Sequence, residues 1–418
     1  MEFMSLKRYV FLILTAYVAV MLTMRYSGWF MNDYVFFIEP AREVYKGTLQ
    51  IYKQKLFPHL APPLGLGYDY PPLYAIIMSP FVAIGDYYNL SDDLIGQYIF
   101  PIPLLIFDVF CLLSLVRLLR FLKPDLSTQN LLMCLILAIA IPGFVSSSIY
   151  FNHIESLLSA FLLTGLYYYF KKAWVRSGIF LSLCLLTKQT GLFAVIPFFI
   201  VNIKGMYEHK TYSETLRLLA ASFLPFCLLF LPFIYADFEN AYYNLVEAHR
   251  VLIISGENVW STINEILKVL STDNYGKIML WIRSYAQLIL VGVMLVTTCA
   301  LVFTDRIRSR GDLLGLLIIS TLLVEVFSKY TSFIYKIVPF TLLIAWDVLR
   351  SKKGVPIVAI TFIALFSIFD SLPMGVHPKG CDATANLFRS FVRIPLNIRL
   401  IVYVFKSIVD KKPKREGL

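Results

Sequence analysis

Charged residues are scarce in this chain of 418 residues, of which only 16% are Asp, Glu, Lys or Arg. A soluble domain has roughly a quarter of such residues, and the mean hydropathy of +0.70 also argues against a soluble globular protein. The sequence lacks a glycine-rich phosphate-binding motif, an HExxH zinc motif and any internal repeat. Because its five histidines are scattered, we predict neither a metal site nor a cofactor.

Cysteine supplies no covalent framework. Five of the six cysteines lie within apolar runs, where a thiol behaves as a small hydrophobic group. Only Cys381 lies in a polar loop, so the spacing predicts neither a disulfide framework nor a metal centre.

Long apolar runs are abundant. They predict an all-α integral membrane protein, a single polytopic domain over residues 1–418 with about twelve transmembrane helices. The expected spans are 9–27, 96–119, 129–148, 154–170, 177–187, 189–203, 216–236, 281–303, 313–328, 333–349, 355–371 and 392–408. The fifth and sixth are short, because "LTKQTG" interrupts them. A cleavable signal peptide is not expected, since no small-residue cleavage site follows the first run.

The net charge of +11 comes from Lys and Arg clusters that recur at every second gap between these spans. This alternation follows the positive-inside rule, so it explains the basic balance without nucleic acid and places both termini in the cytosol. The clusters are Lys7 and Arg8; Arg117, Arg120 and Lys123; Lys171, Lys172 and Arg176; Lys204, Lys210 and Arg217; Arg306, Arg308 and Arg310; Arg350, Lys352 and Lys353; and Lys411, Lys412, Lys414 and Arg415.

The alternation places two long loops, 28–95 and 237–280, on the extracytoplasmic side, with 372–391 and short turns near 150, 188 and 329. Polar residues at membrane depth are costly unless they are used, so we expect the active-site face here. Within 28–95, apolar residues at three- and four-residue spacings predict a short helix in the membrane interface, closed by Gly47. They are Tyr34, Phe37, Ile38, Ala41, Val44 and Tyr45.

Asp33 in "MNDYVFF" follows the first span directly. Its position favours a cap for the interface helix, because Asp often precedes a helical run. The alternative role is that of a general base, which needs only a carboxylate beside an acceptor hydroxyl.

The segment "GYDYPPLY", residues 67–74, combines an acid, three tyrosines and two prolines. The prolines predict a turn and push Tyr70 to an extended backbone. Tyrosines of this kind are typical of an aromatic belt at the membrane interface. Asp69 and the proline pair fit that interpretation less well, and the ring faces and hydroxyls also suit a sugar.

Several further polar residues lie at outer ends of the expected spans. Each one alone is readily explained as a capping or snorkelling residue. Together with Asp33 they place one well-positioned carboxylate and several cations around a cavity at membrane level. That combination fits sugar transfer from a lipid phosphate, in which the acceptor hydroxyl needs a base and the leaving phosphate needs positive charge. The residues are His153, Glu155, Lys188, His249, Arg250, Trp260, Lys329, Tyr330 and Lys336.

At these residues the sequence resembles the GT-C superfamily of membrane glycosyltransferases that use polyprenyl-phosphate sugars. "DYVFFIEPAREVYKG" and "SKYTSFIYKIVPF" are similar to loops of the mannosyltransferase that starts the glycosylphosphatidylinositol mannose core. "YDYPPL", "TKQ" and "HRVL…NVW" resemble segments of the asparagine-linked-glycan glucosyltransferases. In the glucosyltransferases a His-Glu-Lys run stands where this chain has Lys329, Tyr330 and Thr331, so the donor sugar is left open.

The resemblance implies a GT-C fold with a role for each of these residues. Asp33 becomes the catalytic base. The donor phosphate is assigned to Lys188, His249, Arg250, Lys329 and Tyr330. Sugar and acceptor binding is assigned to Tyr34, Arg42, Asp69, Tyr70, His153, Glu155 and Trp260. The segment "GYDYPPLY" is then expected to form a rigid wall of the sugar site.

The resemblance implies an inverting, metal-independent glycosyltransferase. The expected donor is a dolichyl- or polyprenyl-phosphate hexose, mannose in preference to glucose, and the acceptor a lipid-linked glycan or glycolipid. Membrane lipids and a small accessory membrane subunit are the other expected partners. The membrane is a prokaryotic plasma membrane or the endoplasmic reticulum. The rival interpretation is a polyprenyl-lipid flippase or secondary transporter, but the related halves common in transporters are not visible. A non-catalytic assembly subunit has no need of Asp33.

Overall fold

A computed structural model describes residues 2–26, 35–53, 67–149, 153–248, 254, 258–270, 274–329, 333–371 and 383–410. Across these ranges the regular structure is helical and contains no strand. The expected all-α fold is therefore confirmed.

The helices at the predicted spans are α1 (Glu2–Tyr26), α5 (Pro101–Leu122), α6 (Thr128–Ile139), α7 (Phe144–Ile149), α8 (Glu155–Phe170), α9 (Trp174–Thr187), α10 (Leu192–His209), α11 (Tyr212–Ala236), α15 (Tyr275–Phe303), α16 (Arg310–Phe327), α17 (Ile337–Arg350), α18 (Ile357–Ser371) and α19 (Ala383–Val409). The shorter elements are α2 (Val35–Tyr45), α3 (Leu73–Tyr87), α4 (Asp92–Leu94), α12 (Phe238–Tyr242), α14 (Val259–Val269), two π-helical turns, η2 (Ile95–Ile99) and η4 (Tyr243–Glu247), and two 3-10 turns, η3 (Gln189–Gly191) and η5 (Phe333–Lys336).

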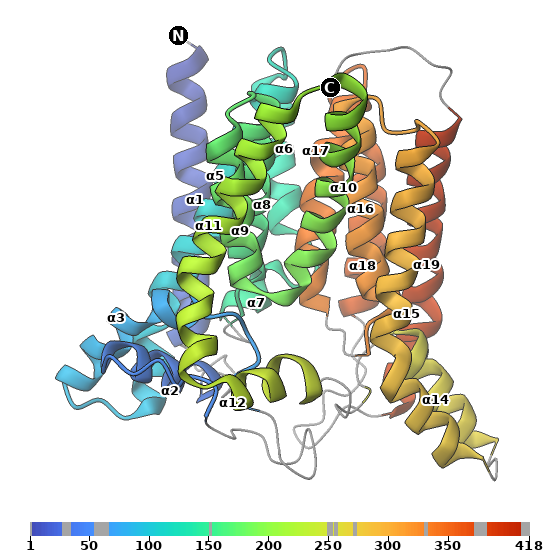
Figure 1. Ribbon diagram of the computed structural model, residues 1–418. Coiled ribbons are helices and arrows are strands. Elements are labelled where there is room, and N and C mark those ends of the chain that lie inside the picture. The colour runs from blue at the N-terminus through green and yellow to red at the C-terminus, as the bar shows by residue number, and fades with distance from the viewer. Residues whose placement is uncertain are drawn as a thin grey trace.

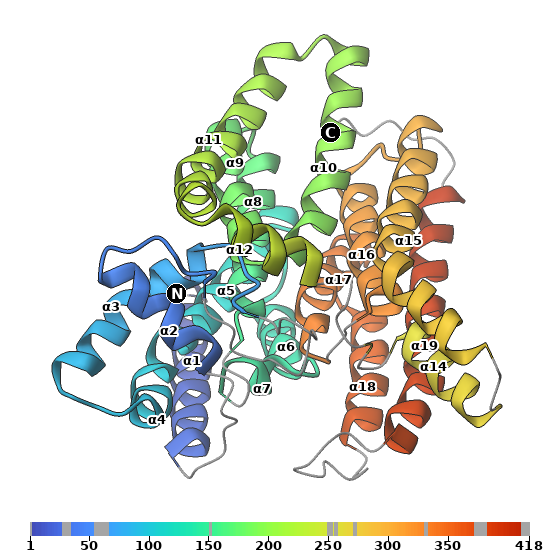
Figure 2. The ribbon, with the colours of Figure 1, turned by 60° about the horizontal axis from the view of Figure 1, so that its bottom comes forward.

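The long helices run side by side, and the start of α1 and the end of α19 lie at the same end of the bundle (Figure 1). The helix ends that carry Arg120, Lys171, Lys210, Arg310 and Arg350 lie at this end too. We call the opposite end, formed by α2, α3, α12 and α14, the distal end. Seen from there, α2 to α4 lie on one side and α14 with the start of α15 on the other (Figure 2). The basic residues that recur at every second gap in the sequence therefore lie at one end of the structure.

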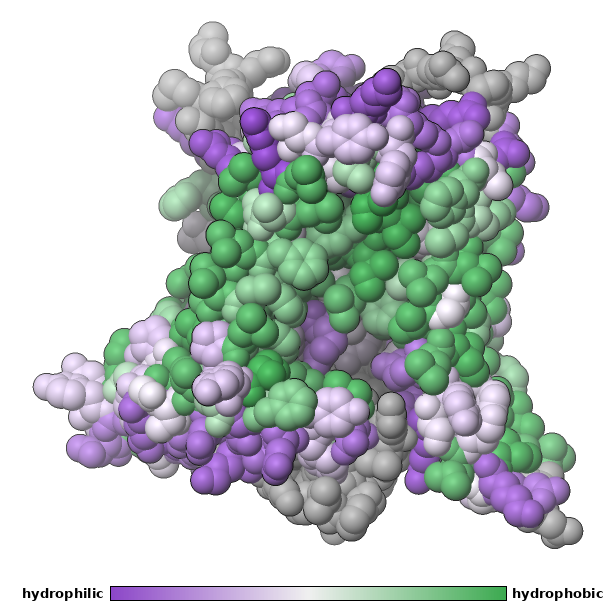
Figure 3. All heavy atoms as spheres, viewed as in Figure 1, coloured by the Kyte–Doolittle hydropathy of each residue, from purple (hydrophilic) through white to green (hydrophobic). Residues whose placement is uncertain are grey.

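The surface has a broad apolar zone between two hydrophilic ends (Figure 3). Five stretches of the described residues are helical, long and apolar enough to cross a membrane: Arg8–Tyr26, Asp92–Leu122, Gln189–His209, Tyr212–Ala236 and Tyr275–Phe303. The protein is thus a multi-pass membrane protein. The other predicted spans are helical too, except that residues 140–143 break the span 129–148 into α6 and α7. The count of twelve crossings remains a prediction.

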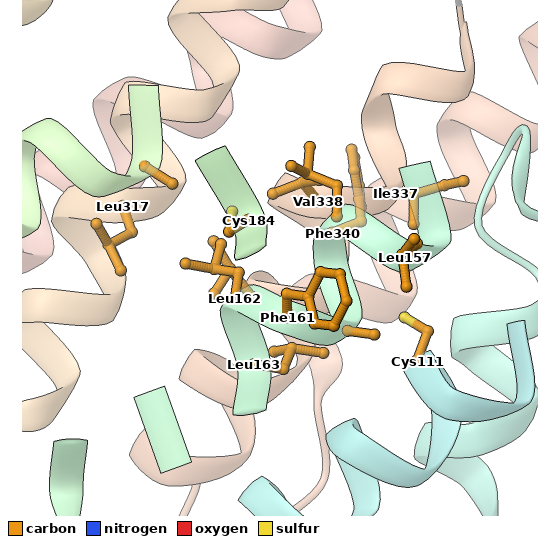
Figure 4. Packing of buried hydrophobic residues seen from close by; sticks show 14 of the residues in the cluster. Cys111, Leu157, Phe161, Leu162, Leu163, Cys184, Leu317, Ile337, Val338 and Phe340 are labelled. Carbon is orange, nitrogen blue, oxygen red and sulfur yellow. The ribbon is translucent and has the colours of Figure 1, made fainter. Parts of the chain in front are cut away.

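Three helices form the centre of the bundle. In α8 every residue except Tyr168 is buried, and α16 and α17 are buried over almost their whole length. In Figure 4 the Phe161 side chain of α8 lies among side chains of neighbouring helices, including Cys111 of α5 and Val338 of α17. A helix that is apolar on all sides is expected in such a central position. Glu155, the first residue of α8, is thereby fixed at the distal end.

The expected interface helix corresponds to α2, and Gly47 closes it with a φ of +79°. Its apolar side chains differ from expectation in what they contact. Phe37, Ile38 and Ala41 are buried within the protein, and α2 packs along α3 instead of presenting this face to lipid. The position of α2 is therefore set by other parts of the chain as well as by the membrane.

Helices α9 and α11 cross closely at Gly178. A Cβ atom there would lie 2.5 Å from the Leu218 carbonyl oxygen and 2.7 Å from the Ala221 Cβ. The absent side chain thus permits the close backbone approach that small residues give to membrane helices.

We expect Gly178→Ala to destabilise the protein by about 1–3 kcal/mol, because the new methyl group has backbone on its far side and nowhere to move. Gly292→Ala in α15 is the matched control, since nothing lies within 4 Å of its Cβ position. Ala is the better helix former, so the control should be neutral or stabilising. SDS titration in mixed micelles measures both, and equal effects at the two sites would contradict the close crossing.

The distal end should face away from the cytosol. Single cysteines at Tyr88, which is exposed after α3, and at Lys352, which is exposed between α17 and α18, test this in a chain whose native cysteines are replaced by Ala. An impermeant maleimide applied to intact cells should label only the cysteine at Tyr88. Labelling of both from outside would refute the orientation.

Candidate active site

The structure does not describe all of the predicted site. Asp33, Tyr34, His249, Arg250 and Tyr330 lie outside the described residues. Their proposed roles stay predictions. The other predicted site residues, from Arg42 to Lys329, are described, and all of them except Arg42 fall into two clusters at the distal end.

The first cluster is organised by an ion pair between Glu155 and Lys188. The Lys188 ammonium donates a hydrogen bond to the Glu155 carboxylate, and their side chains are only 5% and 1% exposed. The ammonium also lies over the rings of Tyr335, 4.4 Å from the centroid, and Tyr70, at 5.0 Å. Lys188 takes this position because α9 ends at Thr187 and the chain is extended before η3 begins. The break in the helix at "LTKQTG" therefore places the Lys188 side chain in the site.

His153 connects the ion pair with Tyr70. Its Nδ1 lies 3.4 Å from the Tyr70 hydroxyl and 3.8 Å from Glu155 Oε2. The pKa of His153 is lowered to about 4. Burial is the main cause, Glu155 opposes the shift, and the Lys188 charge adds to it. At neutral pH this imidazole is uncharged. It can therefore exchange hydrogen bonds with hydroxyl groups, but it supplies no charge to a phosphate.

Two neighbouring serines in α7 support this cluster from below. The Ser147 hydroxyl donates to Glu155 Oε2 at 3.2 Å, and the Ser148 hydroxyl donates to Asp108 Oδ1 at 2.6 Å. The Tyr17 hydroxyl donates to the other Asp108 oxygen at 2.8 Å. Glu155 and Asp108 thus each have hydroxyl donors, as buried charge requires. Sequence patterns had not indicated Ser147 or Asp108.

The segment "GYDYPPLY" is inside the protein. Tyr68 and Tyr74 are fully buried, so they do not form an aromatic belt facing lipid. The Tyr68 hydroxyl donates to the Pro71 carbonyl at 3.2 Å, and Tyr52 donates to the Tyr70 carbonyl at 3.1 Å. Of the three tyrosines, Tyr70 is the one whose hydroxyl reaches His153.

Asp69 is held close to Lys188 through the backbone. Its carbonyl accepts a hydrogen bond from the Gln189 side chain, while its carboxyl group is partly exposed. The chain therefore brings residues 69–70 and 188–189 together across 120 positions of sequence. That pairing fixes the position of the Asp69 backbone relative to the ion pair.

Arg42 is occupied by acids of its own platform. Its guanidinium contacts Glu39, donates to Asp86 at 2.8 and 2.9 Å, and reaches Asp92 at 2.6 Å. The hydrogen bonds from Arg42 hold the pKa of Asp86 below its usual range. Arg42 thereby fastens α2 to α3 and α4. These contacts give a structural reason for an arginine here, and we leave it out of the proposed site.

An apolar crevice leads to the first cluster. Its free volume is about 20 Å³, and it is lined by Leu158, Leu162, Cys184, Ala194, Val324, Val338 and Pro339, with Glu155, Thr190 and Tyr335 among its polar residues. Helices α8, α9, α10, α16 and α17 supply these walls. The surface is also hollowed near the distal end, with hydrophilic residues at depth in an otherwise apolar zone (Figure 3). This lining combines apolar walls with a few polar groups, which matches the chemistry of a ligand that has an apolar part and a polar head.

The second cluster lies between α14, α15 and the segment after α16. The Trp260 indole donates to the Phe327 carbonyl at 2.6 Å, and the Asn258 amide donates to the Lys329 carbonyl at 3.3 Å. The buried Lys329 ammonium donates to the Arg283 carbonyl at 2.8 Å. Trp260 and Lys329, predicted from separate motifs, are thus brought together. Arg283 is a residue that the sequence had not singled out.

An all-α multi-pass bundle with charged clusters buried at one end is the architecture expected of a membrane glycosyltransferase. Comparison with protein families agrees: the model of glycosyltransferase family 87 matches residues 68–328. Because this match spans more than half of the chain, the protein belongs to glycosyltransferase family 87 and is a GT-C-type membrane glycosyltransferase. A search of curated proteins finds no match. The prediction of an enzyme is confirmed, and the transporter alternative is not retained. The closer likeness to the two eukaryotic families remains a prediction.

The Glu155–Lys188 pair yields a stability prediction. We expect Glu155→Gln or Lys188→Met to destabilise the protein by about 3–5 kcal/mol, because each leaves one charge buried without its partner. The double variant should be less destabilised than the sum of the two, since no unpaired charge remains. SDS titration measures all three, and additive losses would show that the two side chains do not interact.

Proposed function

We propose that this member of family 87 transfers a hexose, mannose by preference, from a polyprenyl-phosphate donor to a lipid-linked glycan or glycolipid at the distal, extracytoplasmic end. The observation that carries the proposal is the crevice of apolar side chains that ends at the Glu155–Lys188 cluster. The apolar side chains match a lipid chain in chemistry, and the polar groups beside them match a sugar. Placement of the basic clusters at the other end supports the extracytoplasmic side.

The reaction is a single displacement with inversion. The acceptor hydroxyl oxygen attacks the anomeric carbon of the sugar while the bond from that carbon to the phosphate oxygen breaks. The hydroxyl proton passes to Asp33, which we propose as the general base from its place after α1. The polyprenyl phosphate leaves with both bonding electrons, so it gains one negative charge and needs no general acid. Positive charge near that phosphate therefore stabilises the transition state more than the bound donor.

The first cluster suits the recognition of sugar hydroxyls. Tyr70, the neutral His153 and the partly exposed Asp69 offer donors and acceptors within a small region. Tyr70 and Tyr335 supply ring faces beside Lys188. Since Glu155 already balances the charge of Lys188, this cluster adds little net charge. We therefore propose it as the place for the neutral hexose.

The proposal is tested with purified protein in detergent, polyprenyl-phosphate mannose or glucose labelled in the sugar, and a lipid extract as acceptor. Mannose should pass into the lipid fraction faster than glucose, with release of polyprenyl phosphate. Asp33→Asn should lower the rate by about 10²–10⁴-fold and leave donor binding intact. Because Asn caps a helix about as well as Asp, a pure capping role predicts a nearly normal rate.

Two outcomes would count against the proposal. No transfer from either donor by the wild-type protein would remove the polyprenyl-phosphate donor from the proposal. Full activity of the Asp33→Asn variant would remove Asp33 as the base while leaving the donor in place.

A further inference from the structure

The second cluster brings two cations together from positions 46 residues apart in the sequence. Lys329 is only 2% exposed, and its ammonium donates a hydrogen bond to the backbone carbonyl of Arg283 in α15 at 2.8 Å. The Arg283 side chain starts from the same residue, and its Nε atom is buried without a hydrogen-bond partner in the described part of the chain. A guanidinium nitrogen shielded from water in this way calls for an acceptor.

Like charge at short range strengthens this argument. Burial lowers the pKa of Lys329 to about 8, and the Arg283 guanidinium lowers it as well. Two cations held together at membrane depth are costly, and an anion between or beside them offsets that cost. The feature is therefore arranged for a negatively charged group.

The surroundings hold the cations in place and define one side of the ligand. Asn258 and Trp260 donate to the carbonyls of Lys329 and Phe327, so the segment after α16 is fixed against α14. The same place carries an apolar cluster of Ile254, Trp260, Met279, Ile282 and Ala286. Cations next to an apolar wall match an anionic head that is attached to an apolar chain.

We propose that Arg283, together with Lys329, binds the phosphate of the polyprenyl donor and stabilises it as the sugar departs. The lipid identity of this ligand rests on the proposed function above. The phosphate carries one negative charge as a sugar diester and two as the released monoester. Arg283 has a planar fork of donors that matches two phosphate oxygens, so its binding strengthens as the charge grows. The sugar then lies toward the first cluster and the phosphate at the second.

Binding measurements on the purified full-length protein test this assignment with a short-chain polyprenyl phosphate, its mannosylated form, phosphatidylglycerol and inorganic phosphate as probes. Arg283→Gln should weaken polyprenyl phosphate binding about 10- to 100-fold, the range of a hydrogen bond to a charged group. The loss should be smaller for the mannosylated form, which has one charge less. Arg283→Lys should recover part of the affinity, because it keeps the charge and loses the fork.

Lys277→Gln is the matched control, because Lys277 is an exposed cation on the same helix. It should leave every affinity unchanged. Unchanged polyprenyl phosphate binding in Arg283→Gln would overturn the assignment and leave a side chain that only reaches toward the membrane surface. An equal loss for phosphatidylglycerol would also overturn it, in favour of a general lipid contact. Wild-type binding of inorganic phosphate as tight as that of the lipid would overturn the lipid identity.

The transfer assay separates this inference from the proposed function. If the wild-type protein transfers mannose and Arg283→Gln does so at the same donor KM, the inference fails and the function stands. If the wild-type protein neither binds polyprenyl phosphate nor transfers its sugar, both fail.

Discussion

The buried ion pair of Glu155 and Lys188 holds the distal end together. A carboxylate at the start of the central helix α8 is too costly to leave alone in an apolar surrounding, and so is an ammonium at the end of α9. Three further segments meet at this pair: α7 through Ser147, residues 69–70 through Gln189, and η5 through Tyr335. Helices α8 and α9, whose ends carry the ion pair, also line the apolar crevice.

The two clusters differ in net charge, and this difference organises the proposed chemistry. In the first, Glu155 and Lys188 carry opposite charges, and the uncharged His153 adds only hydrogen-bonding groups. In the second, the Lys329 ammonium contacts the backbone of Arg283, so two like charges lie near each other. A neutral sugar and an anionic phosphate are joined by a single bond in the donor. An enzyme that separates them benefits from one environment for each, with the cations beside the group whose charge increases.

The aromatic segment at 67–74 shows how a membrane protein uses residues that composition alone would place at the lipid interface. Tyr68 and Tyr74 fill the interior, and their burial makes the segment rigid. Phe37 of α2 packs on Tyr74 with ring centroids 4.6 Å apart and on Tyr70 at 5.5 Å. The packing of α2 against Tyr70 therefore helps to hold the Tyr70 ring in place. Arg42 fastens the outer edge of the platform formed by α2 and α3.

The sequence by itself determined the helical class, the positions of the helices, the shared end of the basic clusters and the cap of α2 at Gly47, because these depend on apolar run length, local charge and backbone preference. It also indicated Lys188, Glu155 and Lys329 as costly polar residues. Only the tertiary structure decided their partners. Lys188 forms an ion pair with a carboxylate, whereas Lys329 contacts the backbone of an arginine. Which of these contacts a lysine makes depends on how separate helices are rotated and packed. No local pattern records that rotation, so Arg283 could be found only in three dimensions.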